Sequence, residues 1–449
     1  MGKLFGTDGI RGQANKYPIT PEIALRLGQT LAGRFQAAGA TGMRALIGKD
    51  TRLSGYMLET ALTSGLVSGG MDVYLVGPLP TPAVAHLTRS MGADAGIMLT
   101  ASHNPFDDNG IKIFGGDGFK LDDAMEAKLE AELLAEDVQR EHIPSDRLGK
   151  AFRIDDASGR YIEFAKSSIG SQSLRGLKIV LDCANGASYS IAPTIFRELG
   201  AEVIKIHAEP DGYNINNGCG ALHPATAGHA VKKHGADLGI SFDGDADRVI
   251  FTDAQGAVID GDRILAMCAI SLKECGQLRR NTLVVTSMSN LGLHEAMRRH
   301  GITVEITDVG DRYVLERMRA GGCNLGGEKS GHLIFLDYAT TGDGIISAMQ
   351  VLKLMKRTGK GVTELAACME EYPQKLVSLT VKEKHPLETL PNVQAALKAG
   401  EAALGAAGRI VLRYSGTERK IRVLVEAREQ AAVNTWTEKL TAAIHQDLG

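Results

Sequence analysis

The order of predicted elements repeats three times along the chain, and this recurrence limits the fold more than any other feature of the sequence. Each copy reads strand, helix, strand, helix, strand. The copies begin at the predicted strands "RALIGKD" from Arg44, "LKIVLDCANGAS" from Leu177 and "TLVVTSMSNLG" from Thr282. Because strands that alternate with helices form parallel sheets covered by helices, each copy predicts one α/β domain.

The pattern changes after about Met369. The segment "EEYPQKLVSLTVKEKHP" reads as a linker into a smaller unit, which contains "GRIVLRYSGTERKIRVLVEA" and an amphipathic helix around Trp436. Two strands joined by a turn and followed by a helix are typical of an α+β domain. We therefore predict three similar, mixed and largely parallel α/β domains plus a smaller C-terminal α+β domain, with boundaries at 1–153, 154–256, 257–369 and 370–449.

The charge and cysteine patterns argue against several classes of partner. The 50 basic and 53 acidic residues give a net charge of -3, which provides no electrostatic reason to expect nucleic acid or an anionic membrane. None of the six cysteines forms a C-x-x-C pair, so a zinc site is not expected. The start "MGKLFGTDGIRG" lacks the apolar segment of a signal peptide, and no apolar run is as long as a membrane span. We expect a cytoplasmic protein.

Three loops occupy equivalent places in the three copies, each at the end of a predicted core strand. They read "TASHNP", "DGDADR" and "GEKSGH". In open parallel sheets, functional residues gather in the loops at the carboxyl ends of the strands. Three equivalent loops with different chemistry therefore predict one site built from three domains.

The loop "DGDADR" places Asp243, Asp245 and Asp247 at alternate positions. In an extended segment alternate side chains face the same way, and three carboxylates together repel one another unless a cation lies between them. A hard ion such as Mg²⁺ fits this oxygen-only set. An EF-hand is excluded, because it needs Gly where Arg248 stands and Glu where Ala254 stands. A solvated acidic turn is the plainer alternative; the Arg248 guanidinium is also suited to a phosphate.

The loop "TASHNP" places Ser102 just beyond a predicted buried strand. A hydroxyl-capped turn is the common use of Ser and Asn before Pro. A serine beside Mg²⁺ can instead carry a phosphoryl group, whose charge the metal offsets. No G-x-S-x-G elbow surrounds Ser102, which disfavours a hydrolase triad. His103 and Lys112 are candidates for moving protons or for holding a phosphate oxygen.

The loop "GGEKSGH" combines a carboxylate, a hydroxyl and an imidazole. If the loop is extended, Glu328, Ser330 and His332 share one face and Lys329 points away. These three groups suit the vicinal hydroxyls of a sugar, although an ordinary surface turn is the alternative.

Two further loops have the composition of phosphate-binding segments. "RYSGTERKIR" places two arginines around a turn of small residues, and "GTDGIRG" has similar chemistry. The alternative for the first is a hairpin with surface arginines. The candidate phosphate and substrate residues are Arg413, Ser415, Gly416, Thr417 and Arg422 in the first loop, and Thr7 and Arg11 in the second.

Taken together, "TASHNP", "DGDADR", "GEKSGH" and the C-terminal "SGTE" resemble the markers of the α-D-phosphohexomutases, along essentially the whole chain. The resemblance implies four domains around a central cleft and makes a homodimer the expected assembly. It implies a phosphoserine at Ser102, required for activity, and one Mg²⁺ per chain held by that phosphate and by Asp243, Asp245 and Asp247. It implies that Glu328, Ser330 and His332 read the sugar, and that Arg413, Ser415, Gly416, Thr417 and Arg422 grip the non-reacting phosphate.

Within this family, "LFGTDGIRG", "PDGYNINNGCGALHP" and "TTGDGI" resemble the segments of members that act on an amino-sugar phosphate, and the resemblance implies such a substrate. The implied reaction interconverts glucosamine 6-phosphate and glucosamine 1-phosphate through a bisphosphorylated sugar, on the route to UDP-N-acetylglucosamine. Tyr414 and Arg419 depart from the family pattern, which has Pro at both places. The alternatives are a phosphoglucomutase or phosphomannomutase, a phosphatase that passes through phosphoserine, and a sugar-phosphate-binding protein without activity.

Overall fold

The computed structural model describes residues 4–6, 8–37, 42–135, 143–414 and 419–449. Its described residues form two compact units. One comprises residues 1–288 and 302–367, and the other comprises 289–301 and 368–449. No helix in these described ranges has the length and apolar character needed to cross a membrane.

The first sheet of the larger unit combines a parallel centre with an antiparallel edge. β3, β4, β5 and β7 pair in parallel, whereas β6, β2 and β1 add in antiparallel fashion beside β5. The strand order is β1 (Phe5–Gly6), β2 (Gly9–Gln13), β6 (Asp108–Gly115), β5 (Ala95–Leu99), β3 (Arg44–Lys49), β4 (Asp72–Pro78) and β7 (Ala151–Arg153).

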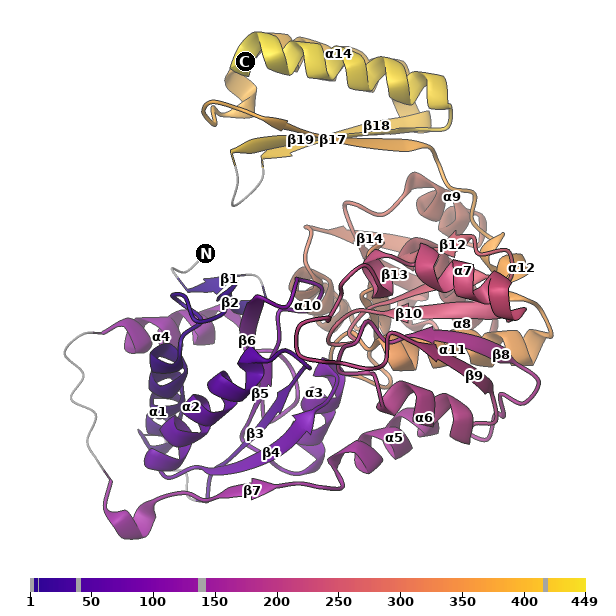
Figure 1. The fold of residues 1–449 in the computed structure, drawn as a ribbon. Helices are drawn as coiled ribbons and strands as arrows, with labels where there is room; N and C mark the ends of the chain where they lie inside the picture. The colour runs from indigo at the N-terminus through magenta and orange to yellow at the C-terminus, as the bar shows by residue number, and fades with distance from the viewer. Residues whose placement is uncertain (1–3, 7, 38–41, 136–142, 415–418) are drawn as a thin grey trace. The chain divides into compact units, whose positions relative to one another are not determined.

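Helices cover both faces of this sheet (Figure 1). Ile47 of β3 belongs to a core with Leu27 and Leu62 of two helices that pack against each other, α1 and α2. The opposite face approaches another helix, α3, so closely that a Cβ at Gly48 would lie 2.4 Å from Val84. Successive residues of β3 therefore pack against helices on opposite faces of the sheet, as expected from the alternation of side chains along a strand. The helices are α1 (Pro21–Ala37), α2 (Ser54–Ser68), α3 (Thr81–Ser90) and α4 (Asp123–Leu134).

The second and third sheets repeat the parallel centre with an antiparallel edge strand. The second has the order β12 (Val258–Ile259), β11 (Val249–Asp253), β10 (Leu238–Phe242), β8 (Lys178–Asp182) and β9 (Glu202–Ile206). The third has the order β14 (Thr303–Thr307), β13 (Thr282–Thr286), β15 (Leu325–Gly327) and β16 (Leu333–Phe335). Their helices are α5 (Ala157–Ser167), α6 (Ile191–Glu198), α7 (Ala225–His234), α8 (Gly261–Glu274), α10 (Asp311–Gly321), α11 (Gly344–Thr358) and α12 (Val362–Ala366).

The smaller unit contains an antiparallel three-stranded sheet whose core is shared with its last two helices. Its order is β17 (Gln374–Thr380), β19 (Lys420–Ala427) and β18 (Gly408–Tyr414), and its helices are α9 (Leu291–Arg299), α13 (Pro391–Leu404) and α14 (Gln430–Leu448). The α/β and α+β classes predicted from the sequence are confirmed. The linker prediction for "EEYPQKLVSLTVKEKHP" was wrong in part, because β17 lies within it and pairs with β19.

Candidate active site

Ser102 is the third residue after the wholly buried strand β5 (Ala95–Leu99) and is itself buried. Its backbone adopts the left-handed region at φ 50°, which few non-glycine residues occupy. Its Oγ donates a hydrogen bond to Oδ2 of Asp243 at 2.7 Å, and Nδ1 of His103 lies 3.4 Å from the same oxygen. The structure therefore brings the predicted nucleophile and one predicted metal ligand into contact.

The three aspartates converge because their loop turns, which differs from the predicted reason. Residues 243–247 form a turn between β10 and β11, with Ala246 at φ 56°, so strand alternation does not align the side chains. One oxygen from each of Asp243, Asp245 and Asp247 lies within 4.8 Å of the others, and all three residues are buried. A tight turn of small residues places three carboxylates together as effectively as an extended segment would.

The surroundings shift the pKa values of two of these aspartates in opposite directions. Burial raises the pKa of Asp243 well above its ordinary value, and the neighbouring carboxylates of Asp247 and Asp245 add to the shift. Burial acts in the same direction on Asp245, but Lys112 and the Thr81 hydroxyl outweigh it and lower the pKa of Asp245. The Nζ of Lys112 lies 3.0 Å from Asp245 and 3.2 Å from Asp247.

The carboxylate cluster fits a divalent cation. Among the described residues, Oδ1 of Asp245 and Oδ1 of Asp247 are buried atoms without a hydrogen-bond partner. A buried, unpaired carboxylate oxygen is costly unless a cation or a donor satisfies it. An oxygen-only set of this kind is the type that Mg²⁺ prefers.

The predicted sugar loop is a tight turn between β15 and β16 rather than an extended segment. Glu328 accepts a hydrogen bond from the backbone N–H of Gly310 at 3.2 Å, whereas Ser330 is exposed. His332 is buried, and neither ring nitrogen has a hydrogen-bond partner among the described residues. Buried ring nitrogens that lack a hydrogen-bond partner in the protein are suited to bind polar groups of a ligand.

The expectation for Lys329 assumed an extended loop; in the observed turn its side chain forms an ion pair. Its Nζ lies 3.4 Å from Asp260. The sugar loop also contacts the metal loop directly: the N–H of Val249 donates to the carbonyl of Gly331 at 3.0 Å, and Arg248 and His332 form a β-bridge. Two of the three predicted loops are therefore joined through their backbones.

The remaining predicted residues of the larger unit lie near these loops. The backbone N–H of Arg248 donates to Asp243 at 3.2 Å, and the side chain of Arg11 donates to Asp8 at 2.7 Å. Burial, together with Arg248 and Arg11, lowers the pKa of His103 to about 4. The predicted residue Thr7 lies outside the described residues.

The predicted phosphate clamp lies on the β18–β19 hairpin. Arg413 and Arg422 stand directly opposite each other in the antiparallel ladder, and both are half-buried. Like charges at directly opposed positions are unfavourable, so this arrangement suits a bound anion. Ser415, Gly416 and Thr417 lie outside the described residues.

The structure adds residues that the sequence analysis did not select. Asp8 lies 3.1 Å from the Nζ of Lys112 and 2.5 Å from the Nζ of Lys120, and Lys120 also pairs with Asp311. Thr81 donates to Oδ2 of Asp245 at 2.6 Å. Asp8 lies within the quoted motif "GTDGIRG" and could have been selected there. Thr81 had no such signal, because its role depends on a contact between residues 164 positions apart.

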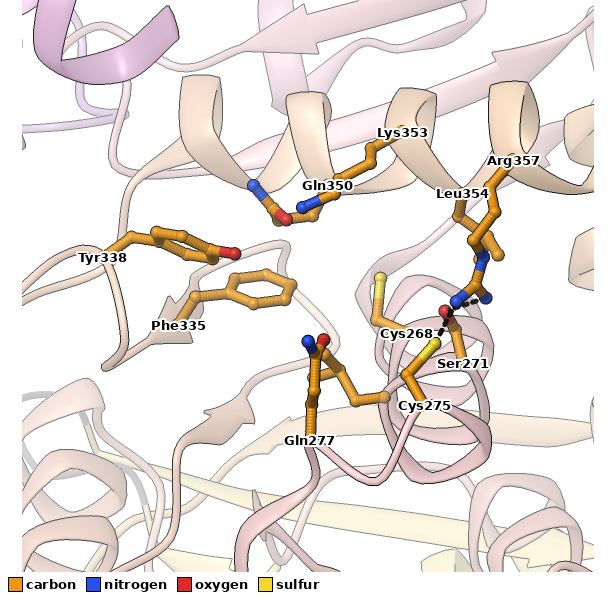
Figure 2. Close-up of a pocket in the computed structure, with 11 residues that line it drawn as sticks. Cys268, Ser271, Cys275, Gln277, Phe335, Tyr338, Gln350, Lys353, Leu354 and Arg357 are labelled. Carbon is orange, nitrogen blue, oxygen red and sulfur yellow. Dashed lines mark hydrogen bonds between the residues drawn. The ribbon is translucent and has the colours of Figure 1, made fainter. Parts of the chain in front are cut away.

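Two other features of the larger unit lack the character of a sugar-phosphate site. Figure 2 shows a pocket between α8 and α11, where Arg357 donates to Ser271 at 2.7 Å and contacts Cys275. Its cavity of about 50 Å³ is far smaller than the roughly 300 Å³ at which small-molecule sites begin. A cluster of Asp182, His207 and Cys219 has a structural explanation, since both Asp182 oxygens accept backbone N–H groups, from Ala184 and Gly220.

Comparison with known proteins identifies the family of the chain. Models of the phosphoglucomutase/phosphomannomutase family match the chain in four parts: α/β/α domain I over residues 2–140, domain II over 159–256, domain III over 260–372, and the C-terminal domain over 376–443. A phosphoglucosamine mutase of Syntrophotalea carbinolica is 52% identical over 448 residues, covering 100% of this chain and 98% of that protein. One of Cereibacter sphaeroides is 53% identical over 443 residues, covering 98% of both.

Solved structures give the same result for the fold. A phosphoglucomutase/phosphomannomutase family protein of Burkholderia thailandensis superposes with a TM-score of 0.81 at 25% identity, covering 98% of this chain and 97% of that one. An N-acetylphosphoglucosamine mutase of Aspergillus fumigatus, solved with GlcNAc-6P and magnesium, gives 0.69 at 18% identity, covering 99% and 96%. Family models that span nearly the whole sequence, and relatives that share half of its residues, establish that the chain belongs to the phosphoglucomutase/phosphomannomutase family, the α-D-phosphohexomutases.

Proposed function

We propose that this enzyme is an intramolecular phosphotransferase that interconverts glucosamine 6-phosphate and glucosamine 1-phosphate. The observation that carries the reaction class is the 2.7 Å hydrogen bond from Ser102 Oγ to a carboxylate of the buried aspartate triplet. The preference for an amino sugar is supported by identity of 52% along the full chain to phosphoglucosamine mutases.

Ser102 would act as a carrier of the phosphoryl group. In the first half-reaction the free hydroxyl of the sugar phosphate forms a bond to phosphorus as the bond from Ser102 Oγ breaks, and the hydroxyl proton passes to a base. The product is a bisphosphorylated sugar. It turns around and returns its other phosphoryl group to Ser102, with the proton going back to the departing sugar oxygen.

Asp243, Asp245 and Asp247 would hold one Mg²⁺ per chain, together with the phosphate on Ser102. The two buried carboxylate oxygens that lack a hydrogen-bond partner, Oδ1 of Asp245 and Oδ1 of Asp247, support this proposal. Bound there, the cation would offset the negative charge that gathers on the transferring phosphoryl group. Lys112 and Arg248 would add positive charge from the protein, and His103 and Lys112 are the candidate proton-transfer groups by proximity.

The substrate would be held at both ends. Glu328, Ser330 and His332 are proposed to contact the sugar, and Arg11 with Thr7 to contact its reacting end. Arg413 and Arg422, with Ser415, Gly416 and Thr417, are proposed to bind the phosphate that does not react. Guanidinium groups suit this task because they bind phosphate oxygens in a bidentate manner.

The decisive experiment compares phosphorylated wild type with Ser102→Ala, using Ser145→Ala, at an exposed position, as the matched control. We expect wild type and the control to carry one phosphoryl group by intact mass and to form glucosamine 1-phosphate, whereas Ser102→Ala does neither. Equal turnover by Ser102→Ala would refute the phosphoserine mechanism.

Parallel assays separate the alternatives. Faster turnover of glucose or mannose phosphates would indicate a phosphoglucomutase or phosphomannomutase, and steady release of inorganic phosphate without isomer formation would indicate a phosphatase. Cytoplasmic location, a homodimer and the domain boundaries 1–153, 154–256, 257–369 and 370–449 belong to the same proposal. Size-exclusion chromatography with light scattering tests the dimer, and limited proteolysis tests the boundaries.

A further inference from the structure

The backbone of the Ser102 loop is held by two side chains outside the three chemical loops. Arg52, between β3 and α2, and Asn216, between β9 and α7, are both buried. Nη2 of Arg52 donates to the carbonyl of Ser102 at 3.2 Å and to the carbonyl of Asn104 at 2.6 Å. Nδ2 of Asn216 donates to the same two carbonyls at 2.9 and 3.0 Å.

This arrangement saturates both carbonyl groups. A carbonyl oxygen has two lone pairs, and here each of the two oxygens accepts one bond from Arg52 and one from Asn216. Nε of Arg52 adds a bond to the carbonyl of Pro105 at 3.4 Å. Arg52 is oriented by its buried ion pair with Asp50, and its own backbone N–H donates to that carboxylate at 2.9 Å.

The loop needs such support because Ser102 has a strained backbone. Its φ of 50° is disfavoured for a residue with a Cβ, and such conformations persist only where the surroundings impose them. The bonds within the loop are few: the N–H of Ser102 donates to Oγ1 of Thr100 at 2.9 Å, and the N–H of Asn104 to the carbonyl of Ala101 at 3.1 Å. Without outside donors the loop could relax and carry Oγ away from Asp243.

The metal loop packs on the same place. A Cβ at Gly244 would lie 2.6 Å from the carbonyl oxygen of Ser102 and 2.8 Å from Nδ2 of Asn216. The point held by Arg52 and Asn216 is therefore also where the loop of Asp243 touches the serine loop. Fixing these carbonyls fixes the position of Ser102 relative to the aspartates.

We propose that Arg52 and Asn216 are positioning residues for phosphoryl transfer, which hold Ser102 in its left-handed conformation with Oγ directed at the carboxylate cluster. This inference rests on the proposed function of Ser102. Neither side chain is required to touch the sugar, so their removal slows the chemical step and leaves substrate binding largely intact.

Asn216→Gly is the sharpest test. Asn216 has a φ of 58°, which glycine adopts without strain, so this variant deletes the two donated bonds and keeps the backbone. Asn217→Gly, at an exposed neighbouring position, is the matched control for added chain flexibility. Arg52→Lys is a second variant, which keeps the charge beside Asp50 but lacks the planar fork that reaches several carbonyls.

We expect kcat of Asn216→Gly to fall roughly 10- to 100-fold, as is common for groups that orient a reacting residue, with KM changed less than about twofold. Hydrogen exchange should quicken at the amides of Ser102 and Asn104 in both variants but not in Asn217→Gly. A wild-type kcat together with unchanged exchange would overturn the proposal. So would equal losses in kcat and substrate affinity with a lowered melting temperature, which indicate a purely structural role.

The two proposals fail separately. If wild type does not turn over glucosamine phosphates, the proposed function is wrong, and the exchange rates of Ser102 and Asn104 still decide whether the two side chains hold the loop.

Discussion

Replacing Gly342 by alanine should slow the enzyme by displacing the imidazole of His332. Gly342 lies in "TTGDGI", and its φ is outside the left-handed region, so alanine is compatible with the backbone. A Cβ there would lie 2.3 Å from Nε2 of His332, whereas ordinary contact begins at 3.4 Å. The imidazole must therefore move by about 1.1 Å, the difference between these two distances.

A displacement of this size is large for a group that is proposed to position the substrate. A misplacement of about 1 Å can cost roughly 100-fold in rate, or about 2.7 kcal/mol in the barrier. We expect kcat/KM of Gly342→Ala to fall by roughly this factor in a coupled assay of glucosamine 1-phosphate formation. Gly361→Ala is the matched control, because nothing lies within 4 Å of the added Cβ and its φ is -71°.

A double-mutant cycle tests the route of the effect. If the loss acts through His332, then His332→Ala combined with Gly342→Ala should be no slower than His332→Ala alone. Activity of Gly342→Ala within threefold of wild type, or penalties that multiply in the double variant, would refute this reasoning.

Three other predictions concern charge. Mg²⁺ at 100 times its Kd should raise the free energy of unfolding of wild type by about 2.7 kcal/mol, and scanning calorimetry should show a higher melting temperature that Asp245→Asn mostly loses. Burial raises the pKa of Asp343 to about 6 from 3.8, so the folded chain favours the protonated carboxyl. Its contribution to stability should fall by about 3 kcal/mol as pH rises from about 4 through 6, and melting temperatures of wild type should show this decline relative to Asp343→Asn, which cannot titrate. Arg413→Ala and Arg422→Ala should each raise KM for the sugar phosphate roughly 10-fold or more, whereas Arg419→Ala, at an exposed position, should change it little; unchanged KM in the first two would contradict the phosphate-clamp assignment.

The sequence predicted the repeated architecture because the signals for it are local. Each strand or helix shows its own period of apolar residues, and the glycines at helix ends mark the boundaries. The same signals failed for "EEYPQKLVSLTVKEKHP". Every residue of β17 is exposed or half-buried, so the segment lacks the features of a core strand, and only pairing with β19 identifies it as a strand.

The sequence alone was enough to select the candidates for the chemistry: a serine, three aspartates and a histidine in loops that follow core strands, and two arginines of the C-terminal hairpin. The sequence did not show how these side chains come together in the fold. Asp243 reaches Ser102 because a turn, not an extended strand, directs it there, and the partners of Ser102 come from residues 114 and 141 positions away. No periodic pattern or fixed spacing in the sequence reveals such contacts. They form only when the separate sheets pack together. The carbonyl groups of Ser102 and Asn104, for example, find their hydrogen-bond donors in Arg52 and Asn216, which are distant in the sequence and close in the folded chain.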